Sequence, residues 1–394
     1  MTHAVPLPRH HAPTAGLVTA LSLALLLSLS PGASAADKAG AAEPQAAKAR
    51  VDGAAAKPAA KPVAKPVAKQ PAAHAGSKRS PAAPRDGGYA NRADVAAFIE
   101  QLVDRHGFDR SALEGVFRQV RKQPTVLRLI APAPSGFKRS WEAYRARFLD
   151  PLRIDGGIAF WRENEEALQR AAGVYGVPAE VIVAIIGVET IYGRVTGEFR
   201  VIDALATLAF DYPRRADYFR EELEQFLLMT RENGADAFAV RGSFAGAIGL
   251  PQFMPGSIRR YAVDFDSDGR IDLRSDPVDA IGSVARFLSE HGWKPGAPVY
   301  FATRIEDTAR LGPLLDAGIE PRFNPVQLAE FGVSALGSAP DDLPLALIDL
   351  PNGDAPTTYL LGANNFYVIT RYNRSSFYAM AVTELADALR SARR

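Results

Sequence analysis

The 394-residue sequence contains no cysteine, which excludes disulfide bonds, thiol nucleophiles and thiolate metal ligands. It also excludes lipid attachment through a cysteine, so a lipoprotein is not expected. After the first 30 residues no apolar run reaches the length of about 20 residues that a transmembrane helix needs. We therefore expect no transmembrane anchor in the mature chain.

The globular part of the sequence also lacks an excess of positive charge, although the whole chain is formally +2. Residues 37–86 contain ten Lys and Arg but only four Asp and Glu, while residues 87–394 contain 35 bases and 40 acids. Nucleic-acid-binding domains usually carry a basic face. We therefore expect no nucleic acid among the partners of the folded part.

The N-terminus has the three parts of an export signal. Basic Arg9 precedes an apolar run over 17–29, and Ala33-Ser34-Ala35 follows a helix-breaking Pro-Gly pair. At about 13 residues, the run is too short for a membrane anchor. The pattern predicts a signal peptide over 1–35 and a soluble, periplasmic mature protein.

Residues 36–88 are dominated by Ala, Lys and Pro, with Lys-Pro pairs recurring every four residues from Lys57. Such a composition buries too little apolar surface to offset the entropy of ordering, so we expect a disordered tether. It is either a simple spacer or a basic segment that follows an anionic surface.

From residue 89 onward, helical periodicity dominates the sequence. Helices are expected around 95–102 and over 156–172, 178–192, 214–232, 277–291 and 376–392. Strands are expected at 298–303, 345–350 and 358–361, within a β-containing insertion over about 294–362. The predicted fold class is mainly α (α+β), with one catalytic domain over 89–394.

The most informative segment, 181–190, is apolar except for Glu189 and Thr190 at its end. Three isoleucines stand three, four and seven positions before Glu189, on the same face of a helix. A carboxylate there is costly unless it is paired or protonated, and the helix C-terminus also disfavours its charge. Both effects raise the pKa, as a general acid near neutral pH requires. Alternatively, the side chain ends its helix and reaches solvent.

Several short segments, taken in order and spacing, are similar to the lytic murein transglycosylase B (MltB) family over nearly all of residues 90–394. They are Ser140–Arg145, Ile185–Thr190, Asp203–Leu208 with Tyr212–Ala216, Gly242–Ala247, Pro251–Pro255 and Asn365–Asn373.

The resemblance implies a lysozyme-like helical core with an extra α region and a small β region. It also implies non-hydrolytic cleavage of the MurNAc–GlcNAc bond of peptidoglycan glycan strands, which leaves a 1,6-anhydroMurNAc end. Glu189 would act as the single acid and base, the substrate N-acetyl group would assist, and no catalytic cofactor would be needed. Cell-wall synthases are candidate partners.

Six further positions match the active site of the family. Ser243 and Gln252 would hydrogen-bond Glu189 and the N-acetyl group, Tyr372 and Asn373 would contact the sugar, and Tyr144 and Tyr378 would line a saccharide groove. The sequence departs from the family pattern at Ile191, Tyr192, Phe287 and Leu250-Pro251, which leaves the acid in place.

Residues 264–275 resemble the start of an EF-hand loop, with acids at positions 1, 3 and 5 and glycine at position 6. The expected ligands of a structural Ca²⁺ are Asp264, Asp266, Asp268, the carbonyl of Arg270 and, by resemblance, Asp279. Ser275 stands where an EF-hand usually has glutamate, and an acidic surface turn without metal is the alternative.

Two other functions remain open from the sequence. A lysozyme-type hydrolase would need a second carboxylate, and the candidates nearby in sequence are Asp203, Asp211 and Asp217. A non-catalytic, calcium-dependent wall-binding protein would not need the acid at Glu189.

Overall fold

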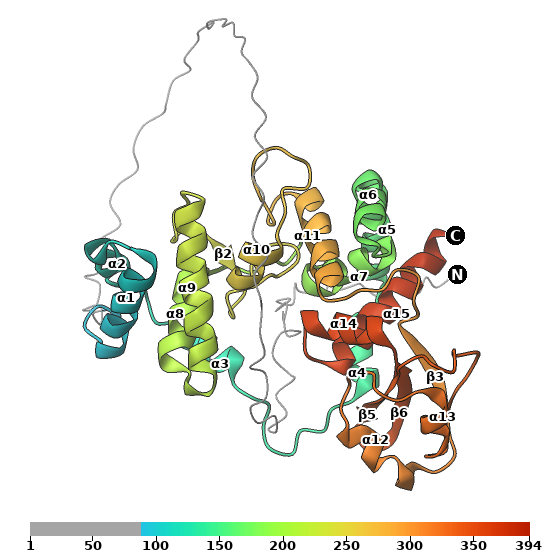
Figure 1. Ribbon diagram of the computed structural model, residues 1–394. Helices are drawn as coiled ribbons and strands as arrows, with labels where there is room; N and C mark the ends of the chain where they lie inside the picture. The colour runs from blue at the N-terminus through green and yellow to red at the C-terminus, as the bar shows by residue number, and fades with distance from the viewer. Residues whose placement is uncertain (1–87) are drawn as a thin grey trace, which may run out of the picture. The chain divides into compact units, whose positions relative to one another are not determined.

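Helices make up most of the described residues, 88–394, of this computed structural model (Figure 1). The helices are α1 (Ala93–His106), α2 (Arg110–Phe117), α3 (Pro124–Ile130), α4 (Trp141–Arg145), α5 (Pro151–Glu163), α6 (Glu165–Tyr175), α7 (Ala179–Thr190), α8 (Val201–Asp211), α9 (Ala216–Glu232), α10 (Pro255–Tyr261), α11 (Pro277–Glu290), α12 (Gly312–Asp316), α13 (Pro325–Ala329), α14 (Asn364–Tyr372) and α15 (Ser376–Arg393). The strands are β1 (Phe199–Arg200), β2 (Arg241–Gly242), β3 (Tyr300–Ile305), β4 (Val333–Ala335), β5 (Ala346–Asn352) and β6 (Ala355–Gly362). The expected signal peptide and nearly all of the expected tether lie outside the described residues.

The largest hydrophobic core surrounds α7, which packs against α5, α6, α11 and α15. Every residue of α7 from Val181 to Thr190 is buried, as its all-round apolar sequence requires. The C-terminal helix α15 contributes a long buried face to the same core, including Phe377 and Leu385. The end of the chain thus packs against the helix that carries Glu189.

A second core joins α1, α2 and α3 to α8 and α9. Its aromatic centre is formed by Phe98, Phe117 and Phe210, whose rings meet edge to face at centroid distances of 5.7–6.2 Å. Such edge-to-face contacts add to the stabilisation from burial alone. This second core corresponds to the extra α region that the resemblance implied.

The β region is a four-stranded antiparallel sheet in the order β4-β3-β6-β5. Leu361 in β6 pairs with Phe301 in β3 and with Leu347 in β5. These residues form a small third core with α12 and α13. The expected fold class, mainly α with a lysozyme-like helical core, an extra α region and a small β region, is confirmed.

Some helix boundaries differ from the sequence-based expectation. The helix expected over 156–172 is divided at Asn164, which ends α5 and precedes α6. No helix was expected at α8, an apolar run of eleven residues of which ten are buried. Buried helices with this pattern cannot be told from buried strands by periodicity alone.

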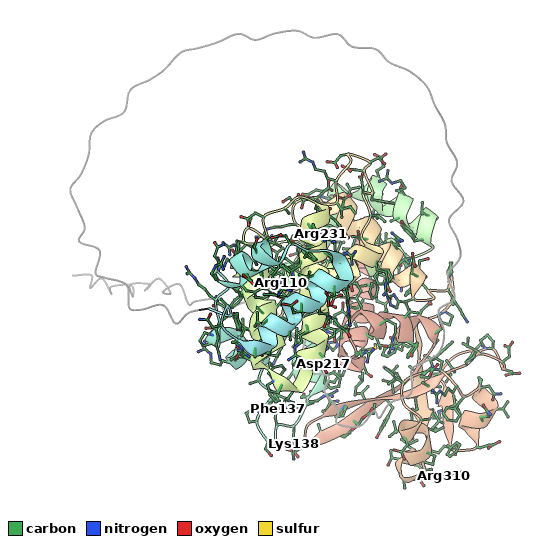
Figure 2. All side chains as sticks on the ribbon, turned by 60° about the vertical axis from the view of Figure 1, so that its left-hand side comes forward. Arg110, Phe137, Lys138, Asp217, Arg231 and Arg310 are labelled. Carbon is green, nitrogen blue, oxygen red and sulfur yellow. The ribbon has the colours of Figure 1, made fainter. Side chains whose placement is uncertain are left out.

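The segment between α3 and α4 runs alongside the β5–β6 hairpin. Gly353 N donates to Arg139 O (2.8 Å), and Lys138 forms an ion pair with Asp354. Phe137 and Lys138 project from this segment (Figure 2), and Phe137 is 59% exposed. The two main cores are therefore connected by a stretch that the hairpin holds.

Within residues 88–394, no single helix is long and apolar enough to cross a membrane. The helices α6 and α7 are long and apolar enough only when they are taken together, and the angle between them is 114°.

Candidate active site

Glu189 is the penultimate residue of α7 and only 7% exposed. The helix begins at Ala179, one residue later than the expected 178, and Pro178 is its N-cap, where the fixed φ of proline suits a helix start. Ile182, Ile185 and Ile186 are fully buried on the face that Glu189 shares. The fold therefore places the carboxyl group against hydrocarbon.

The end of α7 has an unusual backbone. Ile191 and Tyr192 both adopt left-handed conformations, with φ of 52° and 57°. Left-handed non-glycine residues cost about 1–3 kcal/mol each and cluster at functional sites. Tyr192 Oη donates to Arg153 O (2.8 Å), and a Cβ at Gly187 would lie 2.4 Å from this hydroxyl oxygen. Glycine at 187 therefore allows the turn to close over the helix.

Tyr378 Oη donates a hydrogen bond to Glu189 Oε1 at 2.8 Å. Burial raises the pKa of Glu189 from its ordinary value of 4.5 to about 7, although the Tyr378 bond lowers it. The pKa of Tyr378 is raised well above its ordinary range, mainly by burial, so its hydroxyl is a permanent donor. A carboxyl group in this setting exchanges a proton near neutral pH.

This contact differs from the groove-lining place that the sequence suggested for Tyr378. The ring is fully buried on α15, and its hydroxyl faces the acid. The sequence could not reveal the contact, because 189 positions separate the two residues.

Two other tyrosines lie around the acid. Tyr372 at the end of α14 stacks on Tyr378 with a centroid distance of 6.3 Å and an interplanar angle of 12°. Its hydroxyl donates to Pro251 O at 2.5 Å. Tyr144 packs on Phe377, and the charge of Glu189 adds to the burial that raises its pKa. Three aromatic side chains from α4, α14 and α15 thus surround one carboxyl group.

Phe287, at a position where the family pattern suggested a tyrosine, lies under this group. Its ring meets Tyr372 at a centroid distance of 4.9 Å and Phe253 at 5.6 Å. It is buried and supports Tyr372 from α11.

The loop that carries Gln252 is fixed to the end of α7. Thr190 Oγ1 donates to Leu250 O at 2.9 Å and accepts from Gly193 N. Gln252 has a φ of 50°, and its side-chain amide donates to Thr196 O (3.1 Å) and to Gly249 O. The sequence analysis did not assign a role to Thr190, although it directly follows Glu189.

Ser243 and Asn373 are both buried near these loops. Ser243 Oγ accepts from Ala247 N at 3.0 Å and so closes a tight turn. Asn373 follows Tyr372, and its carbonyl accepts from Ser375 N. The side chains of Ser243 and Gln252 thus form hydrogen bonds with backbone groups of the surrounding loops. Tyr378 is the residue that donates to the carboxyl group of Glu189.

The three aspartates considered as second carboxylates all have other partners. Asp203 pairs with Arg200 and accepts from Arg121 N, and Asp211 pairs with Arg92. The side chain of Asp217 is 95% exposed beside Arg220.

The acidic loop before α11 brings three carboxylates together. One carboxylate oxygen each of Asp264, Asp266 and Asp279 lies within 4.8 Å of the other two. Asp279 is 1% exposed and accepts from Phe265 N and Asp272 N. Burial, followed by the charges of neighbouring aspartates, raises its pKa despite these hydrogen bonds.

The other two expected ligands sit in the same loop. Asp268 N donates to Asp264 and Asp266, and Asp268 Oδ1 accepts from Arg270 N. Gly269 has a φ of 89°, which suits glycine at the sharp turn of such a loop. The three-carboxylate group therefore lacks Asp268, which bonds within the turn.

Comparison with known proteins connects this geometry to a family. The model of the transglycosylase SLT domain matches residues 90–387. Membrane-bound lytic murein transglycosylase B of Escherichia coli K12 is 45% identical over 315 residues, which cover 78% of this chain and 85% of that protein.

Solved structures agree. The catenated lytic transglycosylase SltB1 of Pseudomonas aeruginosa is 45% identical, with a TM-score of 0.71 over 78% of this chain and all of the other. E. coli lytic transglycosylase Slt35, solved in complex with calcium, is 45% identical, with a TM-score of 0.70 over 78% of this chain and 96% of the other.

Proposed function

The chain belongs to the transglycosylase SLT family, and on this premise we propose that residues 89–394 form a lytic transglycosylase domain that acts on peptidoglycan. It cleaves the β-1,4 bond between MurNAc and GlcNAc and leaves a 1,6-anhydroMurNAc end. The observation that carries this proposal is a buried carboxyl group, Glu189, with a pKa of about 7 and a hydrogen bond from Tyr378.

Glu189 begins the reaction as the acid. Tyr378 donates to Oε1, so the proton is available on Oε2 for the glycosidic oxygen that leaves. As the bond breaks, the oxygen of the substrate N-acetyl group stabilises the cationic sugar, in place of a second protein carboxylate. The partners of Asp203, Asp211 and Asp217 support this single-carboxylate scheme, because each aspartate has a structural or exposed setting.

Glu189 then acts as the base. Its ionised form removes the proton from the C6 hydroxyl as that oxygen closes on C1, and the carboxyl group returns to its starting state. One group can do both because its pKa lies near neutral pH. Tyr378 stabilises the ionised form between the two steps.

The surrounding residues hold the sugar. Tyr372 stacks on Tyr378, Tyr144 packs on Phe377 beside it in α15, and Asn373 directly follows Tyr372. These are the residues that would contact the sugar. Gln252 and Ser243 shape the loops beside Thr190 through hydrogen bonds to backbone groups, and they would lie near the N-acetyl group of the substrate. The departures at Leu250 and Pro251 keep backbone carbonyls available to Thr190 and Tyr372.

Product analysis tests this function. Purified wall digested by the protein is separated and weighed by mass spectrometry, and the anhydro product is lighter than the hydrolysed product by one water. Glu189→Gln should give neither. A hydrolysed product would instead support a lysozyme-type enzyme, and unchanged behaviour of Glu189→Gln would support a non-catalytic wall-binding protein.

The acidic loop fits Ca²⁺, which takes six to eight oxygen ligands. Asp264, Asp266 and Asp279 would hold the ion, with the carbonyl of Arg270 and with Asp268 after its side chain turns. Hard carboxylate donors favour calcium over zinc. The ion would neutralise three close negative charges and fix the loop before α11, a structural role.

The location and partners follow from the substrate. A wall-cleaving enzyme with a predicted signal peptide and no cysteine acts as a soluble periplasmic protein, in contrast to the relative whose name calls it membrane-bound. The glycan strand is its partner, and cell-wall synthases are candidate protein partners.

A further inference from the structure

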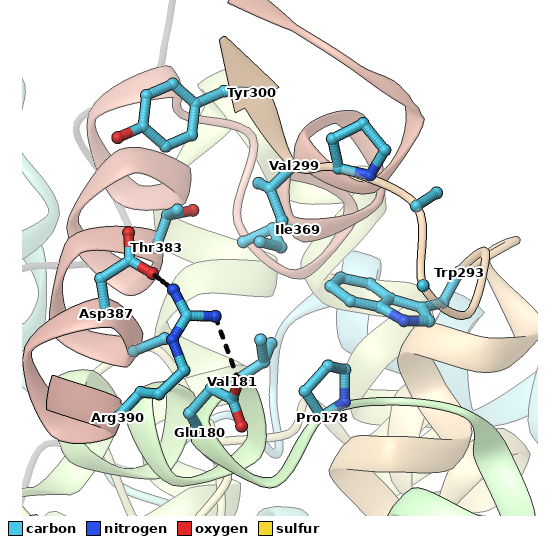
Figure 3. Close-up of a pocket in the computed structure, with 14 residues that line it drawn as sticks. Pro178, Glu180, Val181, Trp293, Val299, Tyr300, Ile369, Thr383, Asp387 and Arg390 are labelled. Atoms are coloured by element: carbon cyan, nitrogen blue, oxygen red, sulfur yellow. Dashed lines mark hydrogen bonds and ion pairs between the residues drawn. The ribbon is translucent and has the colours of Figure 1, made fainter. Parts of the chain in front are cut away.

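A pocket of about 400 Å³ lies at the opposite end of α7 from Glu189 (Figure 3). It is bounded by the first turn of α7, by α15 and by the loop that leads into β3. Glu180 and Glu189 are nine residues apart, so about 13 Å of helix separates the pocket from the acid. Pockets of about 300–1,000 Å³ are typical of small-molecule sites.

The pocket has one apolar wall and one polar wall. The apolar wall includes Trp293, Pro298 and Ile369, and Figure 3 shows Trp293 across from Asp387 and Arg390. The indole Nε1 donates to Gly176 O at 3.1 Å, which fixes the ring in place. A fixed aromatic ring and hydrocarbon suit the apolar face of a sugar ring, which carries C–H groups.

The polar wall offers directional groups for hydroxyls. Arg390 lies between two carboxylates, donating to Asp387 and to Glu180 Oε1 (3.5 Å). Tyr300 stands on the same side, and burial raises the pKa of its hydroxyl, as do the charges of Asp387 and Glu384. The hydroxyl is therefore a neutral donor and acceptor beside a carboxylate acceptor.

The charge of the pocket selects among wall components. Glu180 and Asp387 outnumber Arg390, so the lining is net negative. An acidic peptide would be repelled, whereas a neutral sugar ring would meet both donors and acceptors.

We propose that this pocket is a second saccharide site, which takes a neutral N-acetylated amino sugar from a glycan strand. The proposal rests on the proposed function only in taking its ligand from the same polymer. The site would hold a strand at one end of α7 while Glu189 acts at the other end.

Indole N–H signals in NMR spectra of the Glu189→Gln protein test both sites at once. Trp141 stacks on Tyr144 and reports the active site, whereas Trp293 reports the pocket. The probe is N,N′-diacetylchitobiose, a neutral disaccharide of GlcNAc. The Trp293 signal should shift in a saturable manner, independently of Trp141.

Two variants then address the polar wall. Asp387→Ala and Tyr300→Phe should each weaken the binding seen at Trp293 by about fivefold, since each removes one hydrogen-bonding group. Asp342→Ala, an exposed aspartate in the loop before β5, is the matched control and should bind like the parent.

Failure of the pocket and failure of the enzyme are separable. A Trp293 signal that stays fixed while Trp141 shifts would overturn the pocket proposal and leave the active site intact. Equal binding by Asp387→Ala, Tyr300→Phe and the control would overturn it too, as would a stronger shift with the acidic probe N-acetylmuramoyl dipeptide. The product analysis above tests the enzyme separately.

Discussion

Burial raises the pKa of an acid at two carboxylate sites of this molecule, but the two acids have different neighbours. Glu189 stands among hydrocarbon and aromatic rings, with the neutral hydroxyl of Tyr378 as a donor. Asp264, Asp266 and Asp279 stand together, and the charges of Asp276 and Asp264 add to the burial that raises the pKa of Asp279. The isolated acid is suited to hold a proton and release it, whereas the crowded acids are suited to a divalent cation. Neighbours, rather than the carboxyl group itself, decide which chemistry is available.

Among substitutions at these two sites, Glu189→Gln should have the largest effect on wall cleavage. It removes the only transferable proton while keeping the shape and the acceptor for Tyr378. We expect wall cleavage to fall by about a thousandfold or more, within the range typical of general acid–base groups. The measurement is the release of soluble anhydro fragments from purified wall.

Glu163→Gln, on the exposed end of α5, is the matched control because it makes the same charge change far from Tyr378. It should cleave like the parent. Comparable activity in both variants would mean that the buried acid is not the proton donor.

The same variant should also change the pH dependence of stability. The folded protein binds the Glu189 proton up to about pH 7, whereas an unfolded chain releases it near 4.5. Between these values the folded state holds more protons, so this group lowers the free energy of unfolding as pH rises. The full difference is about 3 kcal/mol.

Denaturant unfolding of the parent and of Glu189→Gln, measured at pH 5 and pH 8, checks this sign. The variant should gain stability relative to the parent at pH 8, and the gain should shrink at pH 5. An equal difference at both values would mean that Glu189 titrates like a solvated glutamate.

Calcium should act on the crowded site alone. Ca²⁺ at about 100 times its dissociation constant would raise the free energy of unfolding by about 2.7 kcal/mol. Asp266→Asn should lose most of this gain, because it removes one of the three close charges from an exposed position. Thermal unfolding in calcium and in EDTA measures the effect.

Asp342→Asn is the control, since its side chain is exposed and lies outside the loop. It should keep the full calcium response. If the parent unfolds at the same temperature in calcium and in EDTA, the loop is an acidic turn without a metal role.

How far the sequence could predict these sites depends on the range of the contacts. The burial of Glu189 was predictable, because ten consecutive residues of one helix determine it. The acids at the start of the loop were equally local, whereas Asp279 was expected only from the family resemblance, and Asp268 bonds within the turn rather than joining the three carboxylates. The mainly α fold followed from periodicity, while α8 did not, since a short apolar run fits a buried strand as well as a buried helix.

The contacts between distant segments could not be predicted. Tyr378 donates to Glu189 because α15 packs on α7, and Thr190 bonds to Leu250 because a loop returns to the helix end. Each depends on tertiary packing that no local pattern encodes. The family resemblance indicated that Tyr378 belongs near the site, but it suggested that this residue lines a saccharide groove rather than donating to Glu189.

Tyr378→Phe should have the smallest effect of these substitutions, and it tests specifically what the hydrogen bond from Tyr378 does to Glu189. The hydroxyl stabilises the ionised form of Glu189, so its loss should raise the pKa of Glu189 further above about 7. The high-pH limb of the kcat/KM profile reports the loss of the acid form, and it should move upward by about one pH unit. The acid step then survives to higher pH, while the base step loses the donor that stabilised its charge.

Tyr144→Phe separates the hydrogen bond from the general effect of an aromatic neighbour. Tyr144 lies near Glu189, whose charge adds to the burial that raises the tyrosine pKa, and Phe keeps the ring contact with Phe377. Its high-pH limb should therefore stay close to that of the parent. A limb that moves equally in both variants, or in neither, would show that burial alone sets the proton affinity. The hydrogen bond from α15 would then serve only to orient the carboxyl group, and the two carboxylate sites would differ in crowding but not in donors.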